Sequence, residues 1–62
     1  MITVVYKEVE YTFDTRGQAV AFIQRIFEKN QIPWALVQRK ESDEGKEYFS
    51  MRSDLRVIYK DT

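Results

Sequence analysis

The sequence contains no cysteine and no histidine. The missing cysteine excludes disulfide bonds and thiolate–metal sites. The missing histidine excludes the usual zinc sites, histidine ligation of haem and histidine-dependent acid–base catalysis. A chain of 62 residues buries only about 60% of its unfolded surface when it folds. Because neither a disulfide nor a common metal site is available to stabilise it, we expect close packing or oligomerisation to do so.

The sequence also lacks an excess of charge of one sign and a long apolar run. Lysine and arginine together number 10, as do aspartate and glutamate, so the formal net charge is zero. This balance disfavours a dedicated nucleic-acid binder, whose surface usually carries a basic excess. No apolar run approaches the roughly 18 residues of a membrane span, and the N-terminus does not resemble a signal peptide. We therefore expect a single cytoplasmic domain over residues 1–62 with no membrane partner.

Motifs that bind phosphates or metals, or that present a nucleophile, are missing as well. There is no P-loop, no GxSxG sequence and no EF-hand spacing. Acidic pairs such as Glu8 with Glu10, or Asp43 with Glu44, do acid–base chemistry or bind a hard cation only inside a cleft. One helix on a small sheet leaves little room for a cleft. We therefore predict no catalytic residue, no metal site and no cofactor, and we do not expect an enzyme.

Apolar and aromatic residues are abundant, at 44% and 15% of the chain. This content favours a folded domain over a disordered tail. We expect five of the aromatic residues to form the centre of the domain: Phe13, Phe22, Phe27, Trp34 and Phe49. Trp34 follows Pro33 directly and is expected to hold the helix against the sheet.

Residues 16–29 show the periodicity of an amphipathic helix. Apolar side chains recur at positions that share one helical face, namely Ala19, Phe22, Ile23, Ile26 and Phe27. Thr15 and Gln18 have the spacing of a capping box, in which the threonine hydroxyl accepts from an early backbone N–H. Asn30 is expected to take the left-handed conformation that ends a helix, and Pro33 prevents continuation.

Residues 2–13 are rich in β-branched and aromatic side chains, which indicates strands. Ile2, Val4 and Tyr6 occupy even positions, and Val9, Tyr11 and Phe13 occupy odd positions. A hairpin that turns at Lys7 and Glu8 brings all of them to one face, with Tyr6 opposite Val9, Val4 opposite Tyr11 and Ile2 opposite Phe13. The turn itself is unfavourable, because it lacks the glycine or asparagine that a tight turn prefers.

Residues 34–60 indicate a three-stranded meander. A strand begins at Trp34, a turn occupies Ser42 to Gly45, and a second short turn at Ser53 and Asp54 precedes the last strand. With the hairpin and the helix, this predicts an α+β single domain of order ββαβββ, with one amphipathic helix packed on a mainly antiparallel sheet.

The register of the meander decides which residues share a face. A four-residue loop at 42–45 puts one apolar set on a first face: Trp34, Leu36, Phe49 and Met51. If the last strand turns tightly at 53–54, Ile58 joins this face. The second face then carries the candidate protein-binding residues: Val37, Tyr48, Leu55, Val57 and Tyr59. One helix covers one face only, so the second face needs a second copy, a partner protein or a tightly curled sheet to cover it. A three-residue loop with a bulge would instead place Val37 opposite Met51, and the sequence leaves both registers open.

We expect a small non-enzymatic interaction protein, a regulator or inhibitor that binds another protein and forms a homodimer. The alternative is a nucleic-acid-binding regulator that uses basic residues of the meander together with the stacking of tyrosines: Arg39, Lys40, Lys46, Arg52 and Arg56. Interspersed acidic residues and the zero net charge disfavour this alternative. The order hairpin, helix, meander is too general to give a function by itself.

Overall fold

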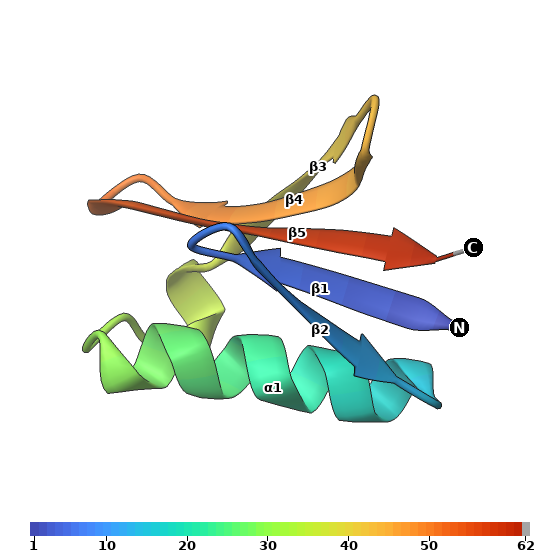
Figure 1. Cartoon of the computed structure of the whole chain (residues 1–62). Coiled ribbons are helices and arrows are strands. Elements are labelled where there is room, and N and C mark those ends of the chain that lie inside the picture. Colours follow the sequence, from blue (N-terminus) through green and yellow to red (C-terminus); the bar gives the residue numbers. More distant parts are fainter. Residues whose placement is uncertain (62) are drawn as a thin grey trace.

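The computed structural model describes residues 1–61 and confirms the α+β fold of order ββαβββ. The elements are β1 (Ile2–Tyr6), β2 (Val9–Phe13), α1 (Arg16–Lys29), a 3-10 turn (Trp34–Leu36), β3 (Gln38–Ser42), β4 (Gly45–Ser50) and β5 (Ser53–Asp61). The strands form one antiparallel sheet in the order β2-β1-β5-β4-β3. Helix α1 packs on one face against β1, β2 and β5, while the β3–β4 hairpin curls away from it (Figure 1). Within residues 1–61 no helix is long and apolar enough to cross a membrane.

The N-terminal hairpin has the predicted register. Tyr6 pairs with Val9, Val4 with Tyr11 and Ile2 with Phe13. Lys7 and Glu8 form the turn with φ values of 52° and 67°. Positive φ at both central residues is the type I′ geometry, whose twist matches that of the flanking strands. Side-chain pairing therefore sets the turn position, although neither turn residue favours it.

Replacing Lys7 by asparagine and Glu8 by glycine is expected to stabilise the fold. In the natural chain, Lys7 and Glu8 each occupy a left-handed conformation, which costs a residue with an ordinary side chain about 1 kcal/mol. We expect a gain of about 1 to 2 kcal/mol in the free energy of unfolding, seen as a rise of several degrees in the thermal midpoint by circular dichroism. Glu44→Gly is the matched control, because Glu44 lies in the other hairpin turn and is not among the residues with positive φ. An equal gain in this control would show that φ is not the cause.

The helix spans residues 16–29 as predicted, but the left-handed residue that follows it lies one position later than expected. The Thr15 hydroxyl accepts from the Gln18 backbone N–H at 3.2 Å. The prediction for Asn30 is wrong: its φ is −94°, and Gln31 has the left-handed φ of 62°. The Ile32 N–H then donates to the Phe27 carbonyl at 2.9 Å, and both of these side chains are buried. This is a Schellman motif, and the apolar contact between its ends selects Gln31 for the strained position.

The meander has the register of the four-residue loop, but two of its boundaries were predicted wrongly. Glu41 pairs with Lys46 and Gln38 with Phe49, as that register requires. The first strand begins at Gln38, because the 3-10 turn after Pro33 folds the Trp34 ring back between helix and sheet. Trp34 lies 6.4 Å from the Phe27 ring and 6.0 Å from the Tyr48 ring, so its predicted role at the helix–sheet contact is confirmed.

The second boundary is the turn between β4 and β5. It lies at residues 51–52 and not at Ser53 and Asp54, and the register shifts at a bulge between Phe49 and Ser50. Ile58 still shares the face of Phe49. Ile58 pairs with Glu47 and Phe49 pairs with Arg56, and all four side chains lie on the side of the sheet away from the helix. The prediction that Phe49 lies at the centre of the domain is therefore wrong.

The proposed open face of the meander is the core face, so that prediction is also wrong. Tyr48, Val57 and Tyr59 are 2%, 0% and 5% exposed, and Val37 and Leu55 pack against the same cluster. The reason is the pairing of Val4 with Tyr59, which brings β5 beside β1 in a register that puts these residues on the helix side. The helix contributes the other half of the core: Ala19, Ile23, Ile26 and Phe27.

Candidate protein interface

The sheet has two edge strands, and they differ in charge. β3 carries Arg39, Lys40 and Glu41 in succession, whereas β2, of sequence VEYTF, carries only Glu10. Charged side chains on an edge discourage pairing with another strand, and an edge without them remains available for pairing. β2 is therefore the edge that is open to strand addition.

The free backbone groups of β2 belong to alternate residues. In a two-residue hairpin the residues that flank the turn exchange backbone hydrogen bonds, and every second pair does the same. Val9, Tyr11 and Phe13 therefore bond to β1. The N–H and C=O groups of Glu10 and Thr12 point to the free edge, and both residues are exposed.

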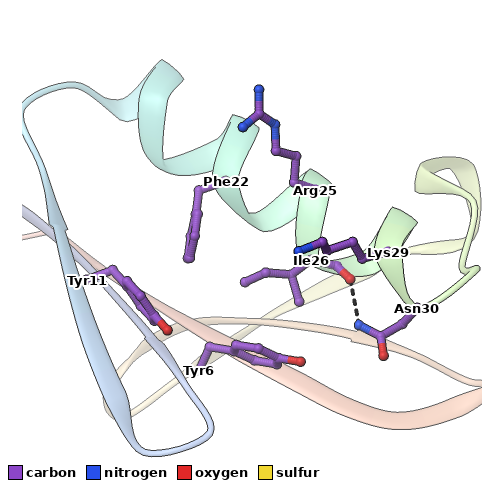
Figure 2. Close-up of a pocket in the computed structure, with 7 residues that line it drawn as sticks. All are labelled: Tyr6, Tyr11, Phe22, Arg25, Ile26, Lys29 and Asn30. Carbon is purple, nitrogen blue, oxygen red and sulfur yellow. Dashed lines mark hydrogen bonds between the residues drawn. The ribbon is translucent and has the colours of Figure 1, made fainter.

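A groove lies beneath β2, between the hairpin and the helix. Its volume is about 490 Å³, and Figure 2 shows the residues that line it: Tyr6, Tyr11, Phe22, Arg25, Ile26, Lys29 and Asn30. A second hollow of about 260 Å³ borders Phe13, Gln18 and Ala21 and shares Phe22 and Arg25 with the first. The groove thus follows α1 along the side of the β2 edge.

Aromatic rings form the wall of this groove. The Phe22 ring from α1 lies 4.7 Å from the Tyr11 ring and 5.2 Å from the Phe13 ring, both tilted. Figure 2 shows Phe22 and Tyr11 facing each other, with Ile26 directed into the space between Phe22 and Tyr6. Val9, the cross-strand neighbour of Tyr6, is 49% exposed. An apolar surface is therefore left uncovered directly below the open edge.

The rim of the groove is cationic. Arg25 and Lys29 border it, none of its lining residues is acidic, and the Lys7 ammonium lies 5.4 Å from the centre of the Tyr6 ring. Among residues 1–61 one ion pair between side chains is found, that of Arg56 with Glu47 at 3.6 Å. It lies on the face of the sheet opposite the groove. A negatively charged group on a partner would therefore meet unpaired cations here.

The basic residues proposed for nucleic-acid binding are not gathered on one surface. Arg39 and Lys46 lie opposite Tyr48 and Tyr59 and thus on the helix side of the sheet. Lys40 is on the other side, with its ammonium 5.5 Å from the Phe49 ring, and Arg56 is paired there with Glu47. Arg52 lies in the turn between β4 and β5. The tyrosines that would stack on bases in that hypothesis are Tyr48 and Tyr59, and both are buried, so the geometry does not favour nucleic-acid binding.

The residues of the groove were only partly visible in the sequence. Tyr6 and Tyr11 are apolar positions of the predicted hairpin, whereas Arg25 and Lys29 lie outside the apolar face predicted for the helix. The low charge of residues 9–13 was a usable signal. It could not be interpreted without the strand order, which makes β2 an edge.

Tyr59 carries a buried hydroxyl that has no hydrogen-bond partner among the described residues. Burial, and next the nearby Asp61 carboxylate, raise the pKa of Tyr59 above its ordinary value, and Arg16 partly opposes them. The side chain packs in the core against Tyr48, at 6.4 Å between ring centres. Its environment therefore favours the neutral phenol and leaves that phenol unsatisfied.

Tyr59→Phe is expected to stabilise the fold by about 1 kcal/mol, because it removes a buried polar group that lacks a partner. The raised pKa also sets a pH dependence. The stabilisation of the neutral phenol is complete below the unfolded-state pKa, near 10, and is lost as the pH rises through the higher folded-state pKa. Urea unfolding between pH 7 and 11 should therefore show a steeper alkaline loss in the natural chain than in Tyr59→Phe. Tyr11→Phe, at the half-buried groove, is the control and should not give the gain of about 1 kcal/mol, because the Tyr11 hydroxyl is not a buried group without a partner.

In residues 1–61 no group of three or more aspartates and glutamates is placed to hold a metal ion. Comparison of the chain with protein-family models, curated proteins and solved structures finds no match. The function is therefore inferred from the geometry of the β2 edge and its groove.

Proposed function

We propose that the chain is a small non-enzymatic interaction domain, a cytoplasmic regulator or inhibitor that acts by pairing β2 with a strand of another protein chain and that pairs with itself as a homodimer. The observation that carries the proposal is the open β2 edge, with unpaired backbone groups at Glu10 and Thr12 above an uncovered groove. Strand addition is a common mode of protein recognition. Main-chain hydrogen bonds give affinity, and pockets beside the edge give specificity.

The composition of the groove supports binding more than catalysis. Its wall is formed by tyrosine, phenylalanine and isoleucine side chains, and it has no carboxylate. Aromatic residues, tyrosine among them, and arginine are enriched in protein interfaces. A domain of this size also gains from association, because a second copy buries apolar surface that one short chain leaves in water.

Thr12→Pro tests the edge directly. The Thr12 N–H points away from β1, so proline removes a donor of the free edge and leaves the hairpin bonds in place. In a symmetric dimer the change acts twice. At about 1 kcal/mol for each lost hydrogen bond, with added steric hindrance, we expect the dimer dissociation constant to rise at least about 30-fold. Light scattering between low and high micromolar concentration measures it.

Thr12→Val is the matched control, because it keeps the N–H and the strand preference and should raise the dissociation constant far less than Thr12→Pro does. A natural chain that is monomeric at high micromolar concentration would remove the homodimer. A dimer that Thr12→Pro leaves intact would place the interface on another part of the surface.

A further inference from the structure

We infer that a second copy of this chain adds antiparallel to β2 with the two-fold axis at Tyr11, so that Phe13 of each copy covers Val9 and closes the groove of the other. This inference rests on the proposed function and specifies its partner and register. The resulting dimer would have one continuous sheet across the axis, with β2 of each copy at its centre.

Backbone geometry leaves few possible registers. Antiparallel pairing joins residues whose N–H and C=O groups point toward each other, and on β2 these are Glu10 and Thr12. A two-fold axis can therefore lie at Glu10, at Tyr11 or at Thr12. The three registers place different side chains opposite each other, and charge distinguishes them.

The axis at Glu10 places like charges within the added strands, and the axis at Thr12 brings a strand carboxylate opposite Asp14. The axis at Tyr11 leaves a like-charge pair only outside β2, between Asp14 and Glu8 of the turn. With the axis at Glu10, the two Glu10 carboxylates lie directly opposite each other. With the axis at Thr12, Glu10 lies opposite Asp14 of the second copy. With the axis at Tyr11, Glu10 lies opposite Thr12 of the second copy, which brings a carboxylate to a hydroxyl. Like charges directly opposite each other destabilise a strand pair, so this register is preferred.

The same register covers the exposed apolar surface. Val9 lies opposite Phe13 of the second copy as a pair without mutual backbone hydrogen bonds, and in such pairs the Cα atoms approach to about 4.5 Å. Both side chains point to the helix side, where Val9 is 49% exposed beside Tyr6. The phenyl ring then reaches the open side of the groove, and each copy supplies the group that completes the site of the other.

Charge at the end of the strand supports this occupant. Asp14 follows Phe13, so Asp14 of the second copy arrives at the Lys7–Glu8 turn, near the rim with Lys29. Glu8 is the like charge at that place, and it lies outside the paired residues. The unpaired cations of the rim, Arg25 and Lys29 together with Lys7, outnumber it.

Cysteine cross-linking determines the register, and the natural chain contributes no thiol. Glu10→Cys and Thr12→Cys are made separately at these two exposed positions and oxidised alone and as a mixture. In the Tyr11-centred dimer, position 10 of one copy faces position 12 of the other at a Cα distance of about 5.5 Å, within disulfide range. Like positions are about 7 Å apart or more, beyond that range.

We expect the mixture to form a disulfide-linked heterodimer, identified by its mass, with a yield on the order of tenfold above that of either variant alone. Glu44→Cys, in the exposed turn between β3 and β4, gives the background from random collision. Cross-linking of Glu10→Cys alone, or of Thr12→Cys alone, would establish one of the other two registers and overturn the inference. A dimer that Thr12→Pro dissociates but that gives no cross-link above background would also overturn it, and would leave the proposed function standing. A monomeric natural chain would end this inference and would remove the homodimer from the proposed function, whose pairing of β2 with another protein would stand.

Discussion

Gly45→Ala is expected to unfold the chain, or to leave it folded only as a minor population. Gly45 begins β4 with φ of 135°, a conformation that side chains rarely adopt. A Cβ atom there would overlap the backbone carbonyl oxygen of Tyr59 in the neighbouring strand, and a backbone atom cannot move aside as a flexible side chain can. Together, backbone strain and collision should cost at least about 3 kcal/mol. A domain of this length has about 3 to 9 kcal/mol of stability in total.

The other glycine of the chain provides the control. Gly17 lies in the first turn of α1, and a Cβ added there meets nothing within 4 Å. Gly17→Ala should therefore stabilise the fold by about 0.5 to 1 kcal/mol through helix propensity. Urea unfolding of both variants, followed by circular dichroism, should show changes of opposite sign. Equal and small effects would mean that β4 does not approach β5 at Tyr59 as the structure shows.

Local signals in the sequence were sufficient for the hairpin and the helix. The change of parity between Tyr6 and Val9 fixed the hairpin register, because one pairing alone brings the apolar residues to one face. The apolar repeat and the threonine cap located the helix at residues 16–29. These features depend on neighbours within about ten residues, which is the range over which sequence patterns report.

Features that depend on distant pairing were not accessible in the same way. The second neighbour of β1 is β5, whose paired residues lie more than fifty positions further along the chain. The pair Val4 with Tyr59 decides which face of the meander the helix covers. Both faces of β4 and β5 carry apolar residues, so the alternation of apolar and polar positions could not decide which face the helix covers. The open edge at β2, and hence the candidate interface, follows from the same strand order.

The prediction with the next largest effect separates these two faces experimentally. Tyr48→Ala should cost about 3 to 5 kcal/mol, because it empties the centre of the core. Tyr48 is 2% exposed, and its ring is stacked at 6.0 Å on Trp34 and packed at 6.4 Å against Tyr59. The variant should be unfolded at room temperature or should melt far below the natural chain, as measured by circular dichroism and by the fluorescence of Trp34.

Phe49→Ala is the matched comparison, because Phe49 is the next residue of β4 and lies on the face away from the helix. Its ring is half-buried, and the Lys40 ammonium lies 5.5 Å from the ring centre. A cation–π contact of this kind near the surface stabilises a fold by less than about 1 kcal/mol. With the lost partial burial, we expect a total cost of about 1 kcal/mol. If Phe49→Ala proved more costly than Tyr48→Ala, the helix would cover the opposite face of the meander. The surface left for a partner would then be the one with Tyr48, Val57 and Tyr59. The expected order of costs agrees with a buried Tyr48 face and is consistent with the β2 edge, with the groove beneath it, as the surface that we propose for a second copy.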